Sequence, residues 1–291
     1  MRLSKLHGLG NDFLVLLDDE SSDDEGCIAA GPGLTKSLCD RRTGVGADGL
    51  ILSRRGDAGV TFELWNADGS VAEMSGNGVR CLALAARRAG WWDDISQPLR
   101  IATSVGERTV RWVSGADDAV MCSVDMGVVT ERRGQWEDVL AHDDGASAER
   151  LDFAGVFAVD IGNPHVVVLL DGDRLPAQAE VEPDIAALER SFPGGVNVEY
   201  VVRGPGPGEV TMIVHERGAG WTQACGTGSC AVAHVARRVS WVGDEATVHN
   251  PGGSVTVTLD GDAARLTGPA VWIADLTPSG QWPFTARRVS Q

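Results

Sequence analysis

The sequence predicts an α/β fold of two similar halves that arose by internal duplication. Residues 75–88 read SGNGVRCLALAARR and residues 225–238 read CGTGSCAVAHVARR, so two glycines, an alanine and an Arg-Arg pair recur at a constant offset of 150 positions. Each copy is a glycine turn with a hydroxyl or thiol residue before it and an apolar helix after it. The free N–H groups and the positive dipole end of such a helix start favour an anion or a thiolate.

Four further pairs of blocks repeat in the same order along the chain. They are 10–17 with 162–170 (Asn11 with Asn163, offset 152), 45–52 with 196–203 (offset 151), 60–75 with 210–225 (offset 150), and 101–113 with 248–259. Chance similarity would not keep these blocks in order with nearly constant spacing, so the duplication covers most of the chain.

Each half reads as a strand, a further segment, two strands, the glycine turn, the helix and a hairpin. Because the connections are short, we expect mostly antiparallel sheets. Residues 268–276 read as a closing strand that returns to the first half. We therefore expect one domain of residues 1–126 plus about 271–291 and a second of residues 127–270. The polar stretches 18–33 and 130–150 are expected to be loops.

Composition excludes several classes of protein. The net charge of −16 disfavours nucleic acid as a partner, and no apolar run approaches the roughly 20 residues of a membrane span. The N-terminus has no signal-peptide core, so a cytoplasmic location is expected. Two lysines outside any cofactor loop, Lys5 and Lys36, argue against pyridoxal phosphate. The six cysteines form no CxxC pair and no histidine cluster accompanies them, so we expect no metal.

The segment GVGADG (44–49) fits the GxGxxG pattern but is not a dinucleotide fingerprint. It follows a polar segment and precedes a strand, whereas the fingerprint follows a strand and opens a helix.

Cys225 is the main chemical candidate. It directly precedes GTG at a helix start, where the dipole and the backbone donors lower the pKa of a thiol and favour a thiolate near neutral pH. The alternative is a small buried cysteine that packs the turn. Cys81 and Cys230 lie inside the predicted helices and are expected to be core thiols.

Other polar residues stand near the glycine turns or at strand ends. His7, His165 and His215 are acid–base candidates, although a structural role is the commoner one for a lone histidine. Glu216 and Arg217 precede Cys225 in a loop, where the guanidinium suits a substrate carboxylate. Amide side chains at matching strand ends suit a zwitterionic ligand. These are Asn11, Asn66, Asn163 and Asn197.

The duplication also suggests a mechanism. Inverting a carbon stereocentre requires removal of a proton from one face and delivery of a proton to the other. Two acid–base groups on opposed half-sites are the simplest machinery for this, and the glycine-turn amides would stabilise the carbanion.

These residues resemble the diaminopimelate epimerase family of cofactor-independent amino-acid epimerases. The resemblance covers almost the whole chain and rests on HGLGNDF (7–13), FELWNADGSVAEM and GNG (62–78), GNPH (162–165), VN (196–197) and ERGAGWTQACGTG (216–228). It implies two pseudo-symmetric α/β domains, each a mostly antiparallel barrel-like sheet around a central helix, with the active site in the cleft between them. It also implies interconversion of LL- and meso-diaminopimelate for lysine and peptidoglycan synthesis, commonly by a homodimer that binds a small zwitterionic amino acid.

The resemblance assigns roles residue by residue. Cys225 matches the second catalytic cysteine, and His165 and Glu216 match positions that tune the two thiols. The substrate-binding positions are matched by Asn11, Asn66, Gly76, Asn77, Asn163, Asn197, Glu216, Arg217, Gly226 and Thr227.

One departure puts the activity in doubt. The first catalytic cysteine of the family precedes the first GNG, and here that residue is Ser75. A serine hydroxyl is far less acidic than a thiol, so inversion is expected to be crippled unless a neighbour activates it. Cys81 is nearly two helical turns away and is no replacement.

Three interpretations are open: an epimerase with an introduced Cys-to-Ser substitution, a natural relative that epimerises or dehydrates another amino acid with a Ser/Cys pair, and a ligand-binding pseudoenzyme. Trp221, beside Cys225, could reshape the pocket in any of them.

Overall fold

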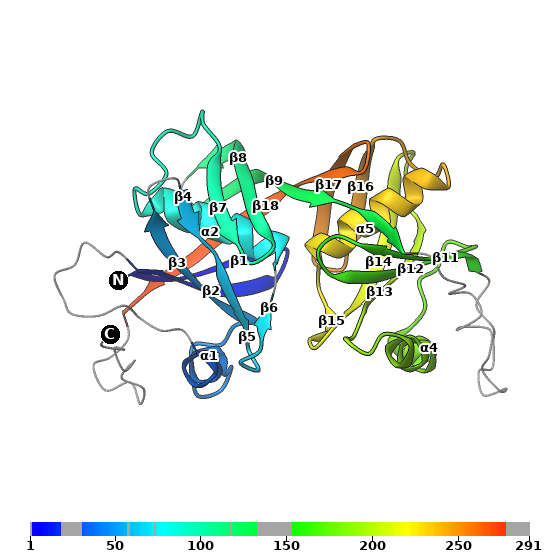
Figure 1. Cartoon of the computed structure of the whole chain (residues 1–291), viewed down its shortest axis with the longest axis horizontal. Helices are drawn as coiled ribbons and strands as arrows, with labels where there is room; N and C mark the ends of the chain where they lie inside the picture. Colours follow the sequence, from blue (N-terminus) through cyan, green and yellow to red (C-terminus); the bar gives the residue numbers. More distant parts are fainter. Residues whose placement is uncertain are drawn as a thin grey trace. The chain divides into compact units, whose positions relative to one another are not determined.

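The structure is a computed structural model that describes residues 2–18, 31–56, 59–72, 74–116, 118–132 and 153–277. Its chain divides into two compact units, Met1–Asp125 with Gly268–Gln291, and Met126–Thr267 (Figure 1). The predicted loops 18–33 and 130–150 lie mostly outside the described residues. Their described ends are regular structure, because residue 18 ends a strand, residues 32 and 33 begin a helix and residues 130–132 form a strand.

Over its described residues, the first unit is a mostly antiparallel sheet with two helices. β1 pairs with both β2 and β18, and β18 also pairs with β9, so these strands close into a barrel. Its elements are β1 (Arg2–Gly8), β2 (Asn11–Asp18), α1 (Pro32–Cys39), β3 (Gly49–Gly56), β4 (Gly59–Thr61), β5 (Glu63–Asn66), β6 (Val71–Ala72), α2 (Gly76–Arg88), β7 (Leu99–Thr103), β8 (Gly106–Ala116), β9 (Ala119–Val128) and part of β18 (Ala263–Leu276).

The second unit repeats this order. Its elements are β10 (Thr130–Arg132), β11 (Phe153–Asp160), β12 (Pro164–Leu170), α4 (Gln178–Ser191), β13 (Asn197–Arg203), β14 (Glu209–Glu216), β15 (Gly220–Thr222), α5 (Gly226–Arg238), β16 (Glu245–Asn250), β17 (Gly253–Asp260) and the first part of β18.

The strand pairings repeat as well. The parallel pair β2–β3 corresponds to β12–β13, and the parallel pair β4–β7 corresponds to β14–β16. The predicted duplicated α/β fold is therefore confirmed. The predicted return of the C-terminal strand is also confirmed, because the second part of β18 pairs with β1 from Leu3↔Leu276 to His7↔Val271.

The predicted register of one block is wrong. Phe13 pairs with Gly49 and His165 pairs with Asn197, so Gly49 and Asn197 are counterparts 148 positions apart, not 151. β13 is buried along nearly its whole length. A strand that is buried on both faces has no alternating pattern to fix its register, which explains the error.

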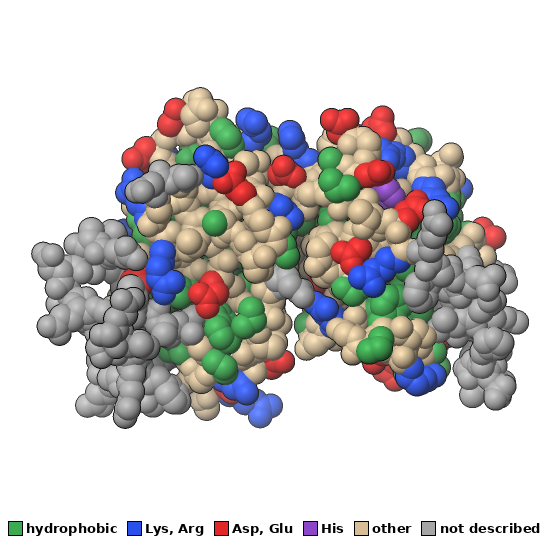
Figure 2. All heavy atoms as spheres, viewed as in Figure 1, with side chains coloured by type: hydrophobic (Ala, Val, Ile, Leu, Met, Phe, Trp, Pro, Cys, Tyr) green, Lys and Arg blue, Asp and Glu red, His purple; other side chains and the backbone are tan. Residues whose placement is uncertain are grey.

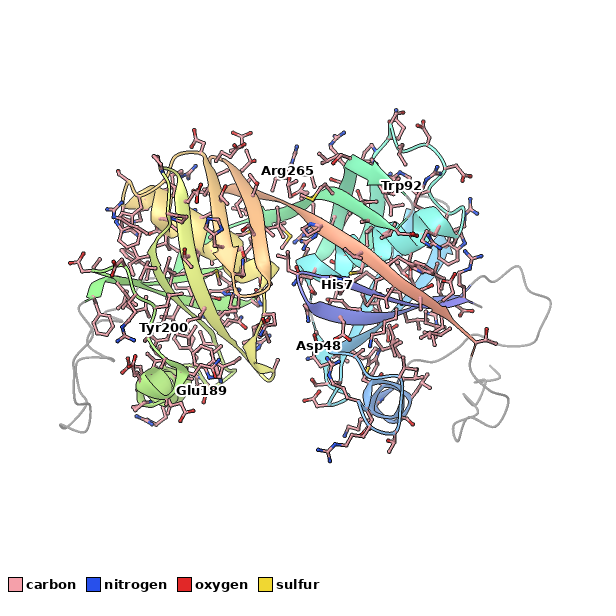
Figure 3. The ribbon with its side chains drawn as sticks, turned by 180° about the vertical axis from the view of Figure 1, so that it is seen from behind. His7, Asp48, Trp92, Glu189, Tyr200 and Arg265 are labelled. Carbon is pink, nitrogen blue, oxygen red and sulfur yellow. The ribbon has the colours of Figure 1, made fainter. Side chains whose placement is uncertain are left out.

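The helices α1 and α4 pack on the sheets in equivalent ways. In the second unit, Val181 and Leu188 of α4 form a core cluster with Tyr200 of β13, which lies beside α4 in Figure 3. In the first unit, Leu38 of α1 packs against Leu14 and neighbouring residues. The segments left unassigned by the sequence pattern are thus the helices α1 and α4, each of which covers a sheet.

The central helices α2 and α5 are buried on all sides along most of their length. Every residue of α2 from Gly76 to Ala86 is buried, as is every residue of α5 from Gly226 to Ala236. A helix enclosed in this way needs mostly small or apolar side chains, and both sequences provide them. The exceptions are the buried polar residues Asn77 and Arg80 of α2 and Thr227, Ser229 and His234 of α5. The N-terminal N–H groups of such a helix are also shielded from water and need acceptors from the protein.

Acidic and basic side chains are interspersed over the face drawn in Figure 2. Within the described ranges, none of the helices combines the length and hydrophobicity needed to cross a membrane.

Arg80 is a charged residue on the buried face of α2. Its side chain is fully buried, and its three guanidinium nitrogens donate to the Pro269 carbonyl (3.0 Å), the Gly76 carbonyl (3.2 Å) and Asn77 Oδ1 (2.6 Å). The fork of donors therefore joins the first turn of α2 to β18.

We predict that Arg80→Lys lowers the free energy of unfolding by about 2 kcal/mol, because a single ammonium cannot reach all three acceptors. Urea denaturation measures this. Arg111→Lys, at an exposed position of β8, is the matched control and should change the free energy of unfolding by less than about 0.5 kcal/mol. Equal effects of the two substitutions would contradict the structural role of Arg80.

Candidate active site

Ser75 and Cys225 occupy equivalent positions, each as the N-cap of its central helix. Ser75 has φ −137° and ψ 119°, and Cys225 has φ −117° and ψ 120°. Ser75 Oγ accepts from the Gly78 N–H at 3.1 Å, and Cys225 Sγ accepts from the Gly228 N–H at 3.3 Å. The predicted repeat of the helix start thus extends to the backbone and to the capping bond itself.

The second helical residue contacts an asparagine in each unit. Asn77 Nδ2 donates to Asn11 Oδ1 at 3.3 Å, and Asn163 Nδ2 donates to Thr227 Oγ1 at 3.5 Å. The structure therefore brings Asn11 and Asn77 together in the first unit and Asn163, Thr227 and Cys225 together in the second.

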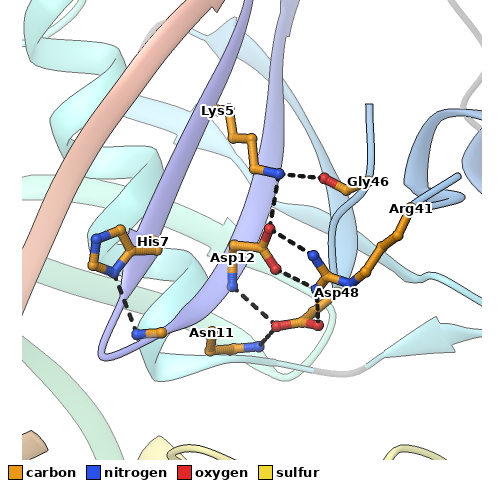
Figure 4. Close-up of polar contacts among 8 residues, drawn as sticks. Lys5, His7, Asn11, Asp12, Arg41, Gly46 and Asp48 are labelled. Atoms are coloured by element: carbon orange, nitrogen blue, oxygen red, sulfur yellow. Dashed lines mark hydrogen bonds and ion pairs between the residues drawn. The ribbon is translucent and has the colours of Figure 1, made fainter. Parts of the chain in front are cut away.

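Asn11 is held by a charged network at the turn after β1 (Figure 4). Its Nδ2 donates to Asp48 Oδ2 at 2.8 Å, and Arg41 bridges Asp48 and Asp12 with two 2.6 Å contacts. Lys5 pairs with Asp12 at 2.9 Å and donates to the Gly46 carbonyl at 2.5 Å. Burial raises the pKa of Asp12, but the hydrogen bonds from Arg41 and Lys5 together lower it below its ordinary value. Asp12 is thus held as a carboxylate.

This network gives GVGADG (44–49) a structural role. Asp48 and Gly46 of that segment hold Asn11 and Lys5, and the segment precedes β3. The rejection of a dinucleotide fingerprint agrees with this position in the fold.

Asn66 ends β5 opposite Gly49, and its Nδ2 donates to Ser70 Oγ at 3.0 Å. Its counterpart in the second unit is Glu216, which ends β14. A neutral amide in one unit therefore stands where the other unit has a carboxyl group.

Glu216 lies beside the Cys225 thiol. Thr222 Oγ1 donates to Glu216 Oε1 at 2.5 Å. Burial raises the pKa of Glu216 above its ordinary value, and hydrogen bonds from Thr222 and from the Cys225 thiol act in the opposite direction.

The pKa of Cys225 differs from the prediction. Burial raises it well above its ordinary value, as do the negative charges of Glu216 and Glu199, while hydrogen bonds from Thr227 and the Gly228 N–H lower it by less. The prediction of a thiolate near neutral pH is therefore wrong. It counted the donors at the helix start and omitted the two carboxyl groups and the burial.

Sequence reasoning missed Glu199. Its carboxyl group is fully buried, and Oε1 lies 2.6 Å from His165 Nδ1. His165 Nε2 in turn lies 3.0 Å from Asn163 Oδ1. A detectable signal was present, because Glu199 is the single charged residue within the apolar run VNVEYVV.

Asn197 and Arg217 support the loop before Cys225. Asn197 Oδ1 accepts from the Arg217 N–H at 3.0 Å, and its Nδ2 donates to the Pro164 carbonyl at 2.9 Å. Arg217 donates to the Gly194 carbonyl at 3.3 Å. Both groups of the Asn197 amide bind backbone, so the structure shows it in a positioning role.

The other histidine candidates have local partners. His7 Nδ1 accepts from the Gly10 N–H at 3.3 Å, and the His215 ring packs edge-on against Trp221 with centroids 5.4 Å apart. Across the described residues, no group of three or more His, Cys, Asp or Glu side chains is arranged to hold a metal ion.

Comparisons with known proteins agree with this arrangement. The sequence matches the family described as "Diaminopimelate epimerase" over residues 3–131 and 157–273. The chain is 37% identical to the diaminopimelate epimerase of Mycobacteroides abscessus over 97% of each chain, and 36% identical to that of Desulfitobacterium hafniense over 94% of this chain and 96% of the relative.

A predicted epimerase from Pseudomonas aeruginosa has a similar fold. It superposes with a TM-score of 0.69 at 15% identity over 96% of this chain and 99% of its own. With the relatives and the two capped helices taken together, the chain belongs to the diaminopimelate epimerase family and is an isomerase.

Proposed function

We propose that the chain acts on LL- and meso-diaminopimelate by cofactor-independent two-base proton transfer, and that Ser75 in place of cysteine impairs this reaction. The observation that carries the proposal is the Cys225 half-site, where the thiol caps α5 beside Glu216. Relatives at 36–37% identity that bear the name of this epimerase support the choice of substrate.

The Cys225 half-site has the groups that one proton transfer needs. The thiol donates a hydrogen bond to Glu216, whose raised pKa suits it to receive the thiol proton. The resulting thiolate takes the α-proton of the substrate, so that a C–H bond breaks, an S–H bond forms and the electron pair remains on the α-carbon. Backbone N–H groups at the helix start stabilise the negative charge that develops on the substrate carboxylate.

The Ser75 half-site has no equivalent set of groups. The counterparts of His165, Glu199 and Glu216 are Phe13, Ile51 and Asn66, none of which exchanges protons near neutral pH. Among the described residues, the hydrogen bond recorded for Ser75 Oγ comes from the Gly78 N–H. Its hydroxyl is therefore not activated as a base, and return of a proton to that face is slow.

The proposal includes the finer expectations from the sequence. The substrate is a small zwitterionic amino acid bound by the asparagine and helix-start groups of the two half-sites, together with Arg217. The enzyme works as a homodimer in the cytoplasm, in lysine and peptidoglycan precursor synthesis, and uses neither pyridoxal phosphate nor a metal.

We predict that Ser75→Cys raises the rate of diaminopimelate epimerisation by at least about 100-fold, because it supplies the missing acid–base group at a preformed cap. Chiral chromatography of LL- and meso-diaminopimelate measures the rate. Ser104→Cys, in the turn between β7 and β8, is the control and should leave the rate unchanged. An unchanged rate in Ser75→Cys would sink the proposal, and tight binding of substrate without turnover in both variants would favour a binding protein.

A second prediction concerns the pH dependence of Cys225. Glu216→Gln removes a negative charge that raises the thiol pKa, so the pH at which half of Cys225 is reactive should fall by about one unit. The rate of iodoacetamide labelling against pH, with the Cys225 peptide quantified by mass spectrometry, measures this. Glu209→Gln on the same strand should not shift the midpoint, and an upward shift in Glu216→Gln would contradict the assigned cause.

A further inference from the structure

A buried His–Glu pair stands behind the Cys225 half-site. His165 of β12 and Glu199 of the parallel strand β13 approach to 2.6 Å, and both side chains are 0% exposed. The helix start comes so close to Glu199 that a Cβ atom added at Gly228 would lie 2.6 Å from Glu199 Oε1 and 3.3 Å from Cys225 Sγ. The pair is thus separated from the sulfur by little more than a glycine.

Donor and acceptor types fix the direction of the hydrogen bonds. The amide oxygen of Asn163 can only accept, so the His165 Nε2 that faces it at 3.0 Å carries a hydrogen. The Asn163 Nδ2 group donates to Thr227 Oγ1 at 3.5 Å. The Thr227 hydroxyl already accepts there, so its own hydrogen is available to Cys225 Sγ at 3.4 Å.

We propose that Glu199 is a positioning residue for Cys225: its carboxylate accepts a hydrogen bond from His165 Nδ1, which orients the ring so that Nε2–H donates to Asn163, and the hydrogen-bond chain His165–Asn163–Thr227 then directs a donor at the sulfur. This chain of hydrogen bonds stabilises the Cys225 thiolate. Its use in catalysis rests on the proposed function.

The groups that face Cys225 come from four elements. Glu216 of β14 and Glu199 of β13 are acidic, His165 of β12 is basic, and Thr227 belongs to α5. Burial and the two carboxyl groups raise the pKa of the thiol, and the Thr227 hydrogen bond lowers it. A chain that ends on Thr227 therefore acts through one of the contacts that favour the thiolate.

In the first unit, a chain of hydrogen bonds at the equivalent place runs in the opposite direction. Arg80 donates to Asn77, Asn77 donates to Asn11, and Asn11 donates to Asp48, at 2.6, 3.3 and 2.8 Å. These donors lead away from the start of α2, and the positions of His165 and Glu199 are held by Phe13 and Ile51. The His–Glu pair is therefore not a requirement of the fold, which the first unit builds without it.

A double-mutant cycle tests whether Glu199 acts on Cys225 through the hydrogen-bond chain or directly through its charge. The readout is the pH midpoint of Cys225 labelling by iodoacetamide, which needs no substrate and so does not depend on the proposed function. Thr227→Val should raise the midpoint by about one unit, because the sulfur loses a donor. Glu199→Gln should raise it by about half a unit while Thr227 is present, and should lower it in the Thr227→Val background, where only the direct effect of the Glu199 charge remains.

A direct effect of the Glu199 charge would give a different result. Removal of a nearby negative charge lowers a thiol pKa, and it would do so equally with and without Thr227. Equal shifts in both backgrounds, or a downward shift or no shift in Glu199→Gln while Thr227 is present, would each overturn the inference. Glu209→Gln is the matched control, because Glu209 also pairs with a histidine of the second unit, His249, at 2.7 Å.

A measurement without substitution covers the case in which Glu199→Gln does not fold. Long-range ¹H–¹⁵N correlation spectra of the unaltered protein should show a hydrogen on Nε2 of His165 between about pH 5 and 8. A His165 that lacks this hydrogen would overturn the inference. Thr227→Ser retains the hydroxyl and should keep the wild-type midpoint, which a role of Thr227 in packing alone would not predict.

Discussion

In both units, the buried N–H group of the third helical residue donates a hydrogen bond to the side chain that caps the helix. Gly78 donates to Ser75 in one unit, and Gly228 donates to Cys225 in the other. This requirement follows from enclosing a whole helix inside a sheet, where water cannot reach the first turn. The capping side chain must carry an oxygen or sulfur atom, and the dipole of the helix favours negative charge on it. One structural constraint thus places a reactive group at the same point in both halves.

The surroundings of the two caps differ in chemistry although the backbone is repeated. Around Cys225 stand Glu216, Glu199 and His165, and the corresponding positions around Ser75 hold an amide and two apolar side chains. Burial and the two carboxyl groups raise the pKa of the thiol, while the Thr227 hydrogen bond lowers it by less. The Cys225 half-site is therefore set to pass a proton between sulfur and a carboxyl group, and the Ser75 half-site supplies donors without an acid–base group.

Local sequence patterns predicted the parts of the molecule that depend on local geometry. The two glycine turns, their helices and the caps Ser75 and Cys225 follow from spacing alone, because a cap and its helix are neighbours in sequence. The register of β13 could not be predicted, since a strand buried on both faces reads the same after a shift. Glu199, Asp48 and Arg80 act on residues of other elements, and only the fold brings them together. The pKa of Cys225 was predicted in the wrong direction for the same reason, because it is raised by burial in the folded protein and by carboxyl groups that come from β13 and β14.

Solvent deuterium exchange tests the unequal roles of the two half-sites most directly. The protein with Ser75 unchanged would be incubated in D₂O with LL-diaminopimelate and, separately, with meso-diaminopimelate. Mass spectrometry would follow the deuterium content of the α-carbons. If Cys225 alone transfers protons, one of the two isomers should take up deuterium faster than it is converted into the other isomer. Equal exchange into both isomers at the rate of their interconversion, or no exchange into either at any pH, would contradict the account.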